Sequence, residues 1–148
     1  MSVTAKMLAF IFAVVSGIAM AVQGSMNSGL AKVIGLLEST LVVHGTGTLA
    51  TFLLLVLGLG KGDFSKITEA PWYLYLGGLI GVLITYGVVA SIPKLGVANA
   101  TTLIIVGQVS AAFLIDCLGL FGLEHVPFTW YKLLGLGFLA AGTWVLLR

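Results

Sequence analysis

The chain contains few charged residues and a single cysteine. Of its 148 residues only 8 % are Asp, Glu, Lys or Arg, against about 25 % in a typical soluble protein, and its mean hydropathy is +1.17. This composition excludes an ordinary soluble domain. The lone Cys117 forms neither a disulfide framework nor a cysteine-based metal cluster. The seven basic residues are scattered and form no patch, so we expect no nucleic-acid partner.

The sequence also lacks the short motifs of common catalytic sites. It contains no GxxxxGK[ST], GxSxG, HExxH or CxxC element, and these motifs carry phosphate binding, nucleophilic catalysis, zinc chemistry and thiol redox chemistry. We therefore expect neither an enzyme nor a metal or cofactor site.

Long runs without a charged residue take the place of these features. Runs of 25, 22, 24 and 21 such residues separate Lys6 from Lys32, Glu38 from Lys61, Glu69 from Lys94 and Lys94 from Asp116. About 20 helical residues cross a hydrocarbon core of about 30 Å. A last run of 15 residues, before Arg148, reaches this length if Lys132 extends its ammonium group to the interface. The sequence thus predicts an all-α integral membrane protein, a single transmembrane domain (1–148) with helices at about 5–31, 38–57, 71–92, 97–120 and 129–147.

The first predicted helix carries a polar stripe beside a small-residue stripe. These are Ser16, Met20, Gln23 and Asn27 and, next to them, Gly17, Ala21, Gly24 and Ser28. Small residues let helix backbones approach closely, and amides in hydrocarbon need partners, so we expect this helix to pack inside the assembly. Gln23 and Asn27 then either bind a solute or bridge helices. A signal peptide is disfavoured, because the apolar run continues to Ala31 and exceeds the length of such a segment.

The second predicted helix has a polar face that contains His44, Thr48 and Thr51. A lone histidine in a membrane helix either bonds to a neighbouring helix or belongs to a transport pathway. No cysteine or carboxylate stands at ligand spacing from it, so we expect no metal. Close helix packing is expected at glycines of several helices, which are Gly17, Gly24, Gly77, Gly81 and Gly119.

The fourth predicted helix places Gln108 and Asp116 on one stripe, two turns apart. A carboxylate at the centre of a membrane helix costs roughly 2.5–3.5 kcal/mol on insertion scales, which favours a functional site. The hypothesis is that Gln23, Asn27, His44, Thr48 and Gln108 contact a solute and that Asp116 provides charge or proton coupling. The alternative is that Asp116 lies near the helix end, where it reaches headgroups or caps a neighbour.

The distribution of basic residues gives almost no instruction for orientation. With five spans, one side of the membrane carries Lys6, Lys61, Lys66 and Lys132, and the other carries Lys32, Lys94 and Arg148. Orientation follows Lys/Arg asymmetry in short loops, so such a chain can insert both ways. Many transporters consist of two inverted repeats with the binding site between them. We therefore expect an antiparallel ten-helix homodimer, or a pair with an oppositely oriented paralogue.

Several stretches resemble one known family. They are GIAMAVQGSMNSGLAK, VHGTGTL, IPKLGVANATTLIIVGQ, FLIDCLGLFG and GLGFLAAGTWVL, and they are similar to the YdcZ-like family of the drug/metabolite transporter superfamily. The resemblance implies five-helix units that act as antiparallel dimers or fused pairs, described as inner-membrane exporters. By motif position it draws attention to Gln23, Asn27, Gly45, Pro93, Gly96, Gln108, Asp116 and Gly119.

The small multidrug resistance branch of this superfamily is similar in size, but its units have four helices and a glutamate in the first. No acidic residue stands in the first helix here, which leaves Asp116 or His44 as the intramembrane proton carriers. The sequence thus predicts an exporter of a small polar or amphipathic solute that works by alternating access. A passive channel and a non-transporting assembly subunit are the alternatives.

Overall fold

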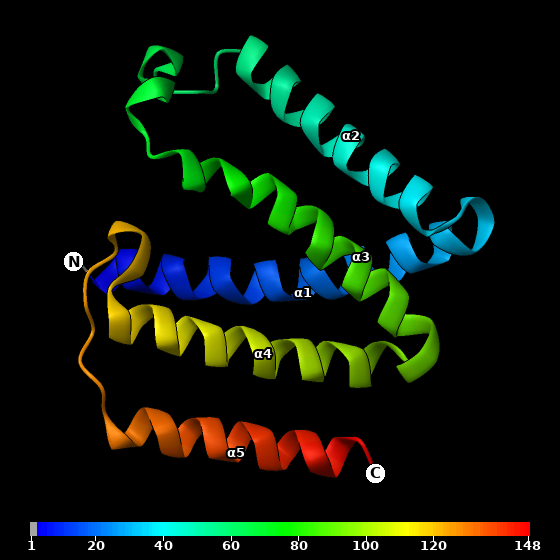
Figure 1. The fold of residues 1–148 in the computed structure, drawn as a ribbon, viewed down its shortest axis with the longest axis vertical. Coiled ribbons are helices and arrows are strands. Elements are labelled where there is room, and N and C mark those ends of the chain that lie inside the picture. Colours follow the sequence, from blue (N-terminus) through cyan, green and yellow to red (C-terminus); the bar gives the residue numbers. More distant parts are fainter. Residues whose placement is uncertain (1–2) are drawn as a thin grey trace. The chain divides into compact units, whose positions relative to one another are not determined.

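The computed structural model describes residues 3–148, and this part of the chain folds into helices joined by short links (Figure 1). The long helices are α1 (Val3–Ile34), α2 (Leu36–Val56), α3 (Gly77–Leu95), α4 (Val97–Leu118) and α5 (Trp130–Leu146). Three short 3₁₀ helices cover Phe64–Glu69, Trp72–Leu76 and Leu120–Gly122. No described residue lies in a strand, so the predicted all-α class is confirmed.

Four helical segments of the described chain are long and apolar enough to cross a membrane. They are Val3–Ile34, Leu36–Val56, Trp72–Leu95 and Val97–Leu118. Helix α5 is also apolar but has only 17 residues, which is shorter than a typical span. The structure therefore shows four helical segments of membrane length, and a fifth span at α5 stays a prediction.

The chain divides into two compact units, one up to Pro93 and one from Lys94. In the first unit, α1 and α2 are joined by Gly35 alone. Gly35 has a φ of 100°, a conformation that side-chain-bearing residues rarely adopt. Its N–H donates to Ala31 O at 3.0 Å and its carbonyl accepts from Ser39 N–H at 3.0 Å. The expected link at residues 32–37 is therefore wrong, because one glycine suffices to turn the chain between two longer helices.

The segment before α3 contains a short capped helix. This is the 3₁₀ helix Phe64–Glu69, which is capped by Asp63. The carboxylate of Asp63 accepts from Ser65 N–H at 3.0 Å and from Ser65 Oγ–H at 2.7 Å. Both hydrogen bonds favour the charged form and lower the pKa of this exposed carboxyl, the side-chain bond most.

Helix α3 is shifted towards the C-terminus relative to the predicted range of 71–92. Pro71 precedes a 3₁₀ helix instead of starting the α-helix, which begins at Gly77. Helix α3 continues through Pro93, which lies in its last turn, and ends at Leu95. Pro93 has no N–H to donate to the carbonyl of Val89, and the helix ends two residues later. The chain turns at Gly96, where φ is 81°.

The second unit consists of α4 and α5, which run antiparallel to each other (Figure 1). Helix α4 ends at Gly119, whose φ of 59° is left-handed, as in a common glycine cap. The link then folds back onto α4, since Val126 N–H donates to Asp116 O at 2.9 Å. The rings of Phe113 and Phe128 lie 5.7 Å apart and fix the link against the helix.

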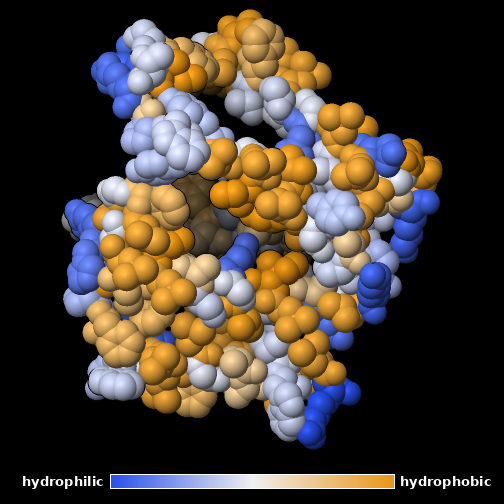
Figure 2. Space-filling view, in the orientation of Figure 1, coloured by the Kyte–Doolittle hydropathy of each residue, from blue (hydrophilic) through white to orange (hydrophobic). Residues whose placement is uncertain are grey.

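Apolar side chains of this fold point mostly outwards. Among the described residues, the buried hydrophobic ones are Val89, Ile92 and Ala100, whereas Phe10 is 73 % exposed and Phe138 is 70 % exposed. Figure 2 shows one face of the molecule, on which hydrophobic surface predominates. Such a surface is costly in water and favourable in lipid, at roughly 25 cal/mol for each Å² of apolar area removed from water. The distribution is that of a membrane protein.

Candidate functional site

A pocket of about 590 Å³ opens between helices of the first unit. Its polar lining comes from all three long helices of that unit and consists of Gln23 of α1, His44, Thr48 and Thr51 of α2, and Thr85 of α3. Its apolar lining comes from α2 and consists of Val43, Phe52 and Leu55. The pocket thus combines hydrogen-bonding groups with a hydrophobic wall, as small-molecule sites commonly do.

The helical repeat of α2 explains why its polar residues reach the same pocket. His44, Thr48 and Thr51 follow at intervals of four and three residues, which places them on one face of the helix. The hydroxyl of Thr48 donates to His44 O at 2.8 Å, and the hydroxyl of Thr51 donates to Gly47 O at 2.9 Å. The hydroxyl hydrogens are therefore occupied by the helix's own backbone.

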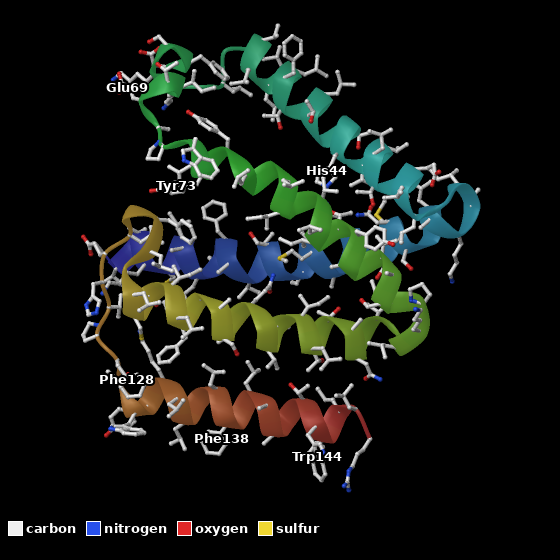
Figure 3. The ribbon with its side chains drawn as sticks, in the orientation of Figure 1. His44, Glu69, Tyr73, Phe128, Phe138 and Trp144 are labelled. Atoms are coloured by element: carbon white, nitrogen blue, oxygen red, sulfur yellow. The ribbon has the colours of Figure 1, made fainter. Side chains whose placement is uncertain are left out.

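His44 links α2 to α3. Its side chain points from α2 towards α3 (Figure 3), where Nε2 and the hydroxyl oxygen of Thr85 are hydrogen-bonded at 3.2 Å. Gly81 lies one turn before Thr85, and a Cβ at this glycine would stand 3.4 Å from Cε1 of His44. The glycine thus leaves room for the imidazole beside α3. The side chain that lies next to Gly81 is that of His44.

Helix α1 approaches α3 at Gly24, one residue after the pocket residue Gln23. A Cβ at Gly24 would stand 2.8 Å from Cγ1 of Val88 and 3.3 Å from Cδ1 of Ile92. Real Cβ atoms essentially never come closer than 3.0 Å to such neighbours. The absence of a side chain at Gly24 therefore permits this close approach and holds Gln23 at the edge of the pocket.

The polar residues of the pocket lie near the middle of their helices. His44 is two residues before the centre of α2, and Thr85 is one residue before the centre of α3. Gln23 is within five residues of the centre of α1. At 1.5 Å per residue these offsets are at most about 7 Å along each axis. In helices that span a bilayer, this places the pocket at mid-depth, where transporters commonly hold their substrates.

The remaining residues singled out in the sequence lie elsewhere. Asn27 is buried, with 8 % of its surface exposed, and does not line the pocket. Gln108 belongs to α4 in the second unit, where it is exposed. No atom would lie within 4 Å of a Cβ added at Gly17 or Gly77. Within the described chain, these two glycines therefore make no close contact with another helix. The solute-binding roles of Asn27 and Gln108 stay predictions.

Asp116 lies two residues before the end of α4 and pairs with Lys132 of α5. Nζ of Lys132 and Oδ2 of Asp116 are 3.7 Å apart, and the two side chains are 38 % and 47 % exposed. The carboxylate thus lies near a helix end, as the alternative for Asp116 expects, and it stands beside a cation. The coupling role of Asp116 stays a prediction. Among the described residues, no group of three or more His, Cys, Asp or Glu is arranged to hold a metal ion.

The sequence did not indicate Thr85 as a partner of His44. Spacing alone places Thr85 on the same helix face as Gly77 and Gly81, because the three residues follow one another at intervals of four. The signal that could have found it is chemical, since a hydroxyl in an apolar helix and a histidine in another both need partners in hydrocarbon. Which two positions meet depends on how the helices pack, and no local pattern specifies this.

Comparison with protein families gives one match that covers nearly the whole chain. Residues 8–145 match a family model, DMT_YdcZ, whose description is "Putative inner membrane exporter, YdcZ". Comparison with curated proteins and with solved structures finds no match. The family description agrees with the membrane-length helices, which makes this a multi-pass inner membrane protein. The chain therefore belongs to the DMT_YdcZ family, the family that its sequence resembles.

Proposed function

We propose that the protein exports a small polar or amphipathic solute by alternating access, and that the solute binds in the pocket between α1, α2 and α3. The observation that carries this proposal is the cluster of Gln23, His44, Thr48 and Thr85 around one pocket at mid-depth of membrane-length helices. Polar side chains are costly to place in hydrocarbon, so where they occur they commonly mark a contact between helices or a solute pathway. Here they line an open volume of about 590 Å³, large enough for a small solute.

The working unit is an antiparallel dimer of two five-span chains. Helix α5, at 17 residues, is about 26 Å long, and the flexible ammonium chain of Lys132 in its first turn reaches the interface. Arg148 anchors the other end, where its guanidinium lies 3.7 Å from the ring centroid of Trp144. The near balance of basic residues allows both orientations of such a chain. Two inverted copies then enclose the solute path, to which Asn27 and Gln108 contribute.

Flux through reconstituted protein tests whether the pocket is the path. Proteoliposomes are loaded with labelled sorbitol or with methyl viologen, and efflux is measured for the wild type and for Thr48→Trp, whose indole fills the pocket. Thr46→Trp is the matched control, because Thr46 lies on α2, is exposed and does not line the pocket. We expect efflux of at least one probe to be lost in Thr48→Trp and kept in Thr46→Trp. Equal efflux in both variants would place the path elsewhere.

The same vesicles separate a transporter from a channel. Alternating access includes conformational steps on microsecond-to-millisecond timescales, so the flux saturates with solute concentration. Unsaturated flux above about 10⁵ molecules per second would instead indicate a passive channel. If no probe crosses in any orientation of the protein, the chain acts as a non-transporting subunit.

Asp116 is the proposed coupling group, and its pairing with Lys132 makes a clear test available. Asp116→Asn removes the carboxylate, whereas Lys132→Gln leaves it in place without its partner. If Asp116 carries the proton, Asp116→Asn abolishes flux driven by a pH gradient and Lys132→Gln does not. If both variants keep pH-driven flux, the ion pair only joins α4 to α5.

A further inference from the structure

The hydroxyl groups along α2 present acceptors to the pocket. A hydroxyl has one hydrogen to donate and two lone pairs that accept. Thr48 and Thr51 donate their hydrogens to the carbonyls of His44 and Gly47, at 2.8 Å and 2.9 Å. Their oxygen lone pairs remain for a ligand in the pocket, and a hydroxyl that already donates is a somewhat stronger acceptor.

The other polar groups of the pocket do not reverse this excess of acceptors. The hydrogen bond between His44 Nε2 and Thr85 leaves this pair one hydrogen to donate in either tautomer, on Nδ1 of His44 if Thr85 donates or on the Thr85 hydroxyl if Nε2 donates. This single donor does not outweigh the lone pairs of Thr48 and Thr51. Gln23 offers both an N–H₂ group and a carbonyl oxygen. A ligand that carries several hydrogen-bond donors therefore fits this lining better than one that only accepts.

The lining carries no fixed charge. Among the described residues, those that line the pocket include no Asp, Glu, Lys or Arg. A charged group taken from water into a low-dielectric site is costly unless an opposite charge and hydrogen bonds compensate it. The pocket has no carboxylate for a cation and no ammonium or guanidinium group for an anion. Val43, Phe52 and Leu55 instead offer apolar contact to a carbon skeleton.

We infer that the pocket selects an uncharged solute that bears hydroxyl or amide N–H donors on a partly apolar skeleton, and that it rejects permanent organic cations. This inference rests on the proposed function, because it assigns the chemical class of the exported solute. The donors of the solute bind the oxygens of Thr48 and Thr51, and its skeleton lies against Phe52 and Leu55.

Two threonine substitutions test this assignment without changing the shape of the pocket. Thr48→Val and Thr51→Val each replace a hydroxyl by a methyl group of similar size, and the hydrogen bond lost within the protein is one to the helix's own backbone. Thr46→Val is the matched control, since the Thr46 hydroxyl donates in the same way to Val43 O, at 2.9 Å, and Thr46 does not line the pocket. All four proteins are purified as full chains in lipid nanodiscs.

Binding is measured as the shift of the thermal unfolding midpoint over a concentration series of each probe. The uncharged probes are sorbitol, uridine and nicotinamide, and the cationic probes are tetraphenylphosphonium and methyl viologen. We expect at least one uncharged probe to bind to the wild type and to Thr46→Val. Its Kd should rise about two- to tenfold in each pocket variant, as for the loss of one hydrogen bond.

Three results would overturn the inference: binding of the cations in place of the uncharged probes, no binding of any uncharged probe, or equal affinity in the pocket variants and Thr46→Val. Efflux of the cations from proteoliposomes, blocked by Thr48→Trp, would refute the solute class and leave the export function standing. Binding of an uncharged probe without flux of any probe would refute export and leave the binding preference of the pocket intact.

Discussion

Replacing Gly24 by alanine should destabilise the first unit. The new methyl group would stand 2.8 Å from Cγ1 of Val88 and 3.3 Å from Cδ1 of Ile92. Val88 is β-branched and has few alternative rotamers in a helix, and Ile92 is buried, so neither side chain yields easily. Overpacking of this kind costs about 1–3 kcal/mol. The gain from placing alanine in a helix interior is at most about 1 kcal/mol.

Gly29→Ala is the control, because Gly29 lies on the same helix and no atom stands within 4 Å of its added Cβ. The free energy of unfolding is measured for both variants by titrating detergent-solubilised protein with sodium dodecyl sulfate and following helix content. We expect Gly24→Ala to be less stable than Gly29→Ala by about 1–3 kcal/mol.

A compensating variant shows whether the contact with α3 causes the loss. Val88→Ala removes the methyl group that the new Cβ would meet, so Gly24→Ala should cost less in the Val88→Ala background than in the wild type. Such a double-mutant cycle isolates the energy of this contact. Equal stability of Gly24→Ala and Gly29→Ala, or an unchanged cost in the Val88→Ala background, would refute the close approach of α1 and α3.

Three further predictions concern the links between helices. The side chains of the ion pair of Asp116 and Lys132 are about half exposed. A double-mutant cycle of Asp116→Asn and Lys132→Gln should therefore give a coupling energy below about 1 kcal/mol that falls with added salt. A larger coupling energy that does not depend on salt would contradict this. Gly119→Ala should lower the unfolding free energy by about 1–2 kcal/mol, because alanine is strained at a φ of 59°, and an unchanged value would count against this cap. Asp63 should titrate below its ordinary pKa of about 3.9, since Ser65 lowers the pKa. This cap is therefore present at neutral pH and lost as the pH falls through the lowered pKa, and Ser65→Ala should raise the pKa in an NMR titration.

The sequence predicts the helices of this protein better than the links between them. Spans without charged residues predict helices close to α1, α2, α3 and α4, because the energetics of burial in hydrocarbon do not depend on packing details. The links are less predictable. A single glycine, Gly35, replaces an expected loop, and Pro93 is tolerated inside the last turn of α3. Both outcomes depend on the backbone conformation at single residues, such as the φ of 100° at Gly35, which the composition of the spans does not specify.

The site was predictable in part, from the periodicity of single helices. Spacing places His44 and Thr48 on one face of α2, and the structure brings them to one pocket. Spacing also groups Gln23 with Asn27 on α1, but only Gln23 lines the pocket. The position of Lys132 beside Asp116 depends on the path of the chain between α4 and α5. Helical periodicity defines faces, and packing between helices decides which face meets which.

The orientation of the chain in the membrane is the measurement that tests the inverted dimer most directly. In a Cys117→Ser background, one cysteine is placed after Arg148, and an impermeant thiol reagent is applied to intact cells and, separately, to inverted vesicles. Labelling of about half the molecules from each side is the result that two inverted copies require. Labelling from one side only would contradict the homodimer of inverted copies, and would require an oppositely oriented partner chain or a parallel assembly.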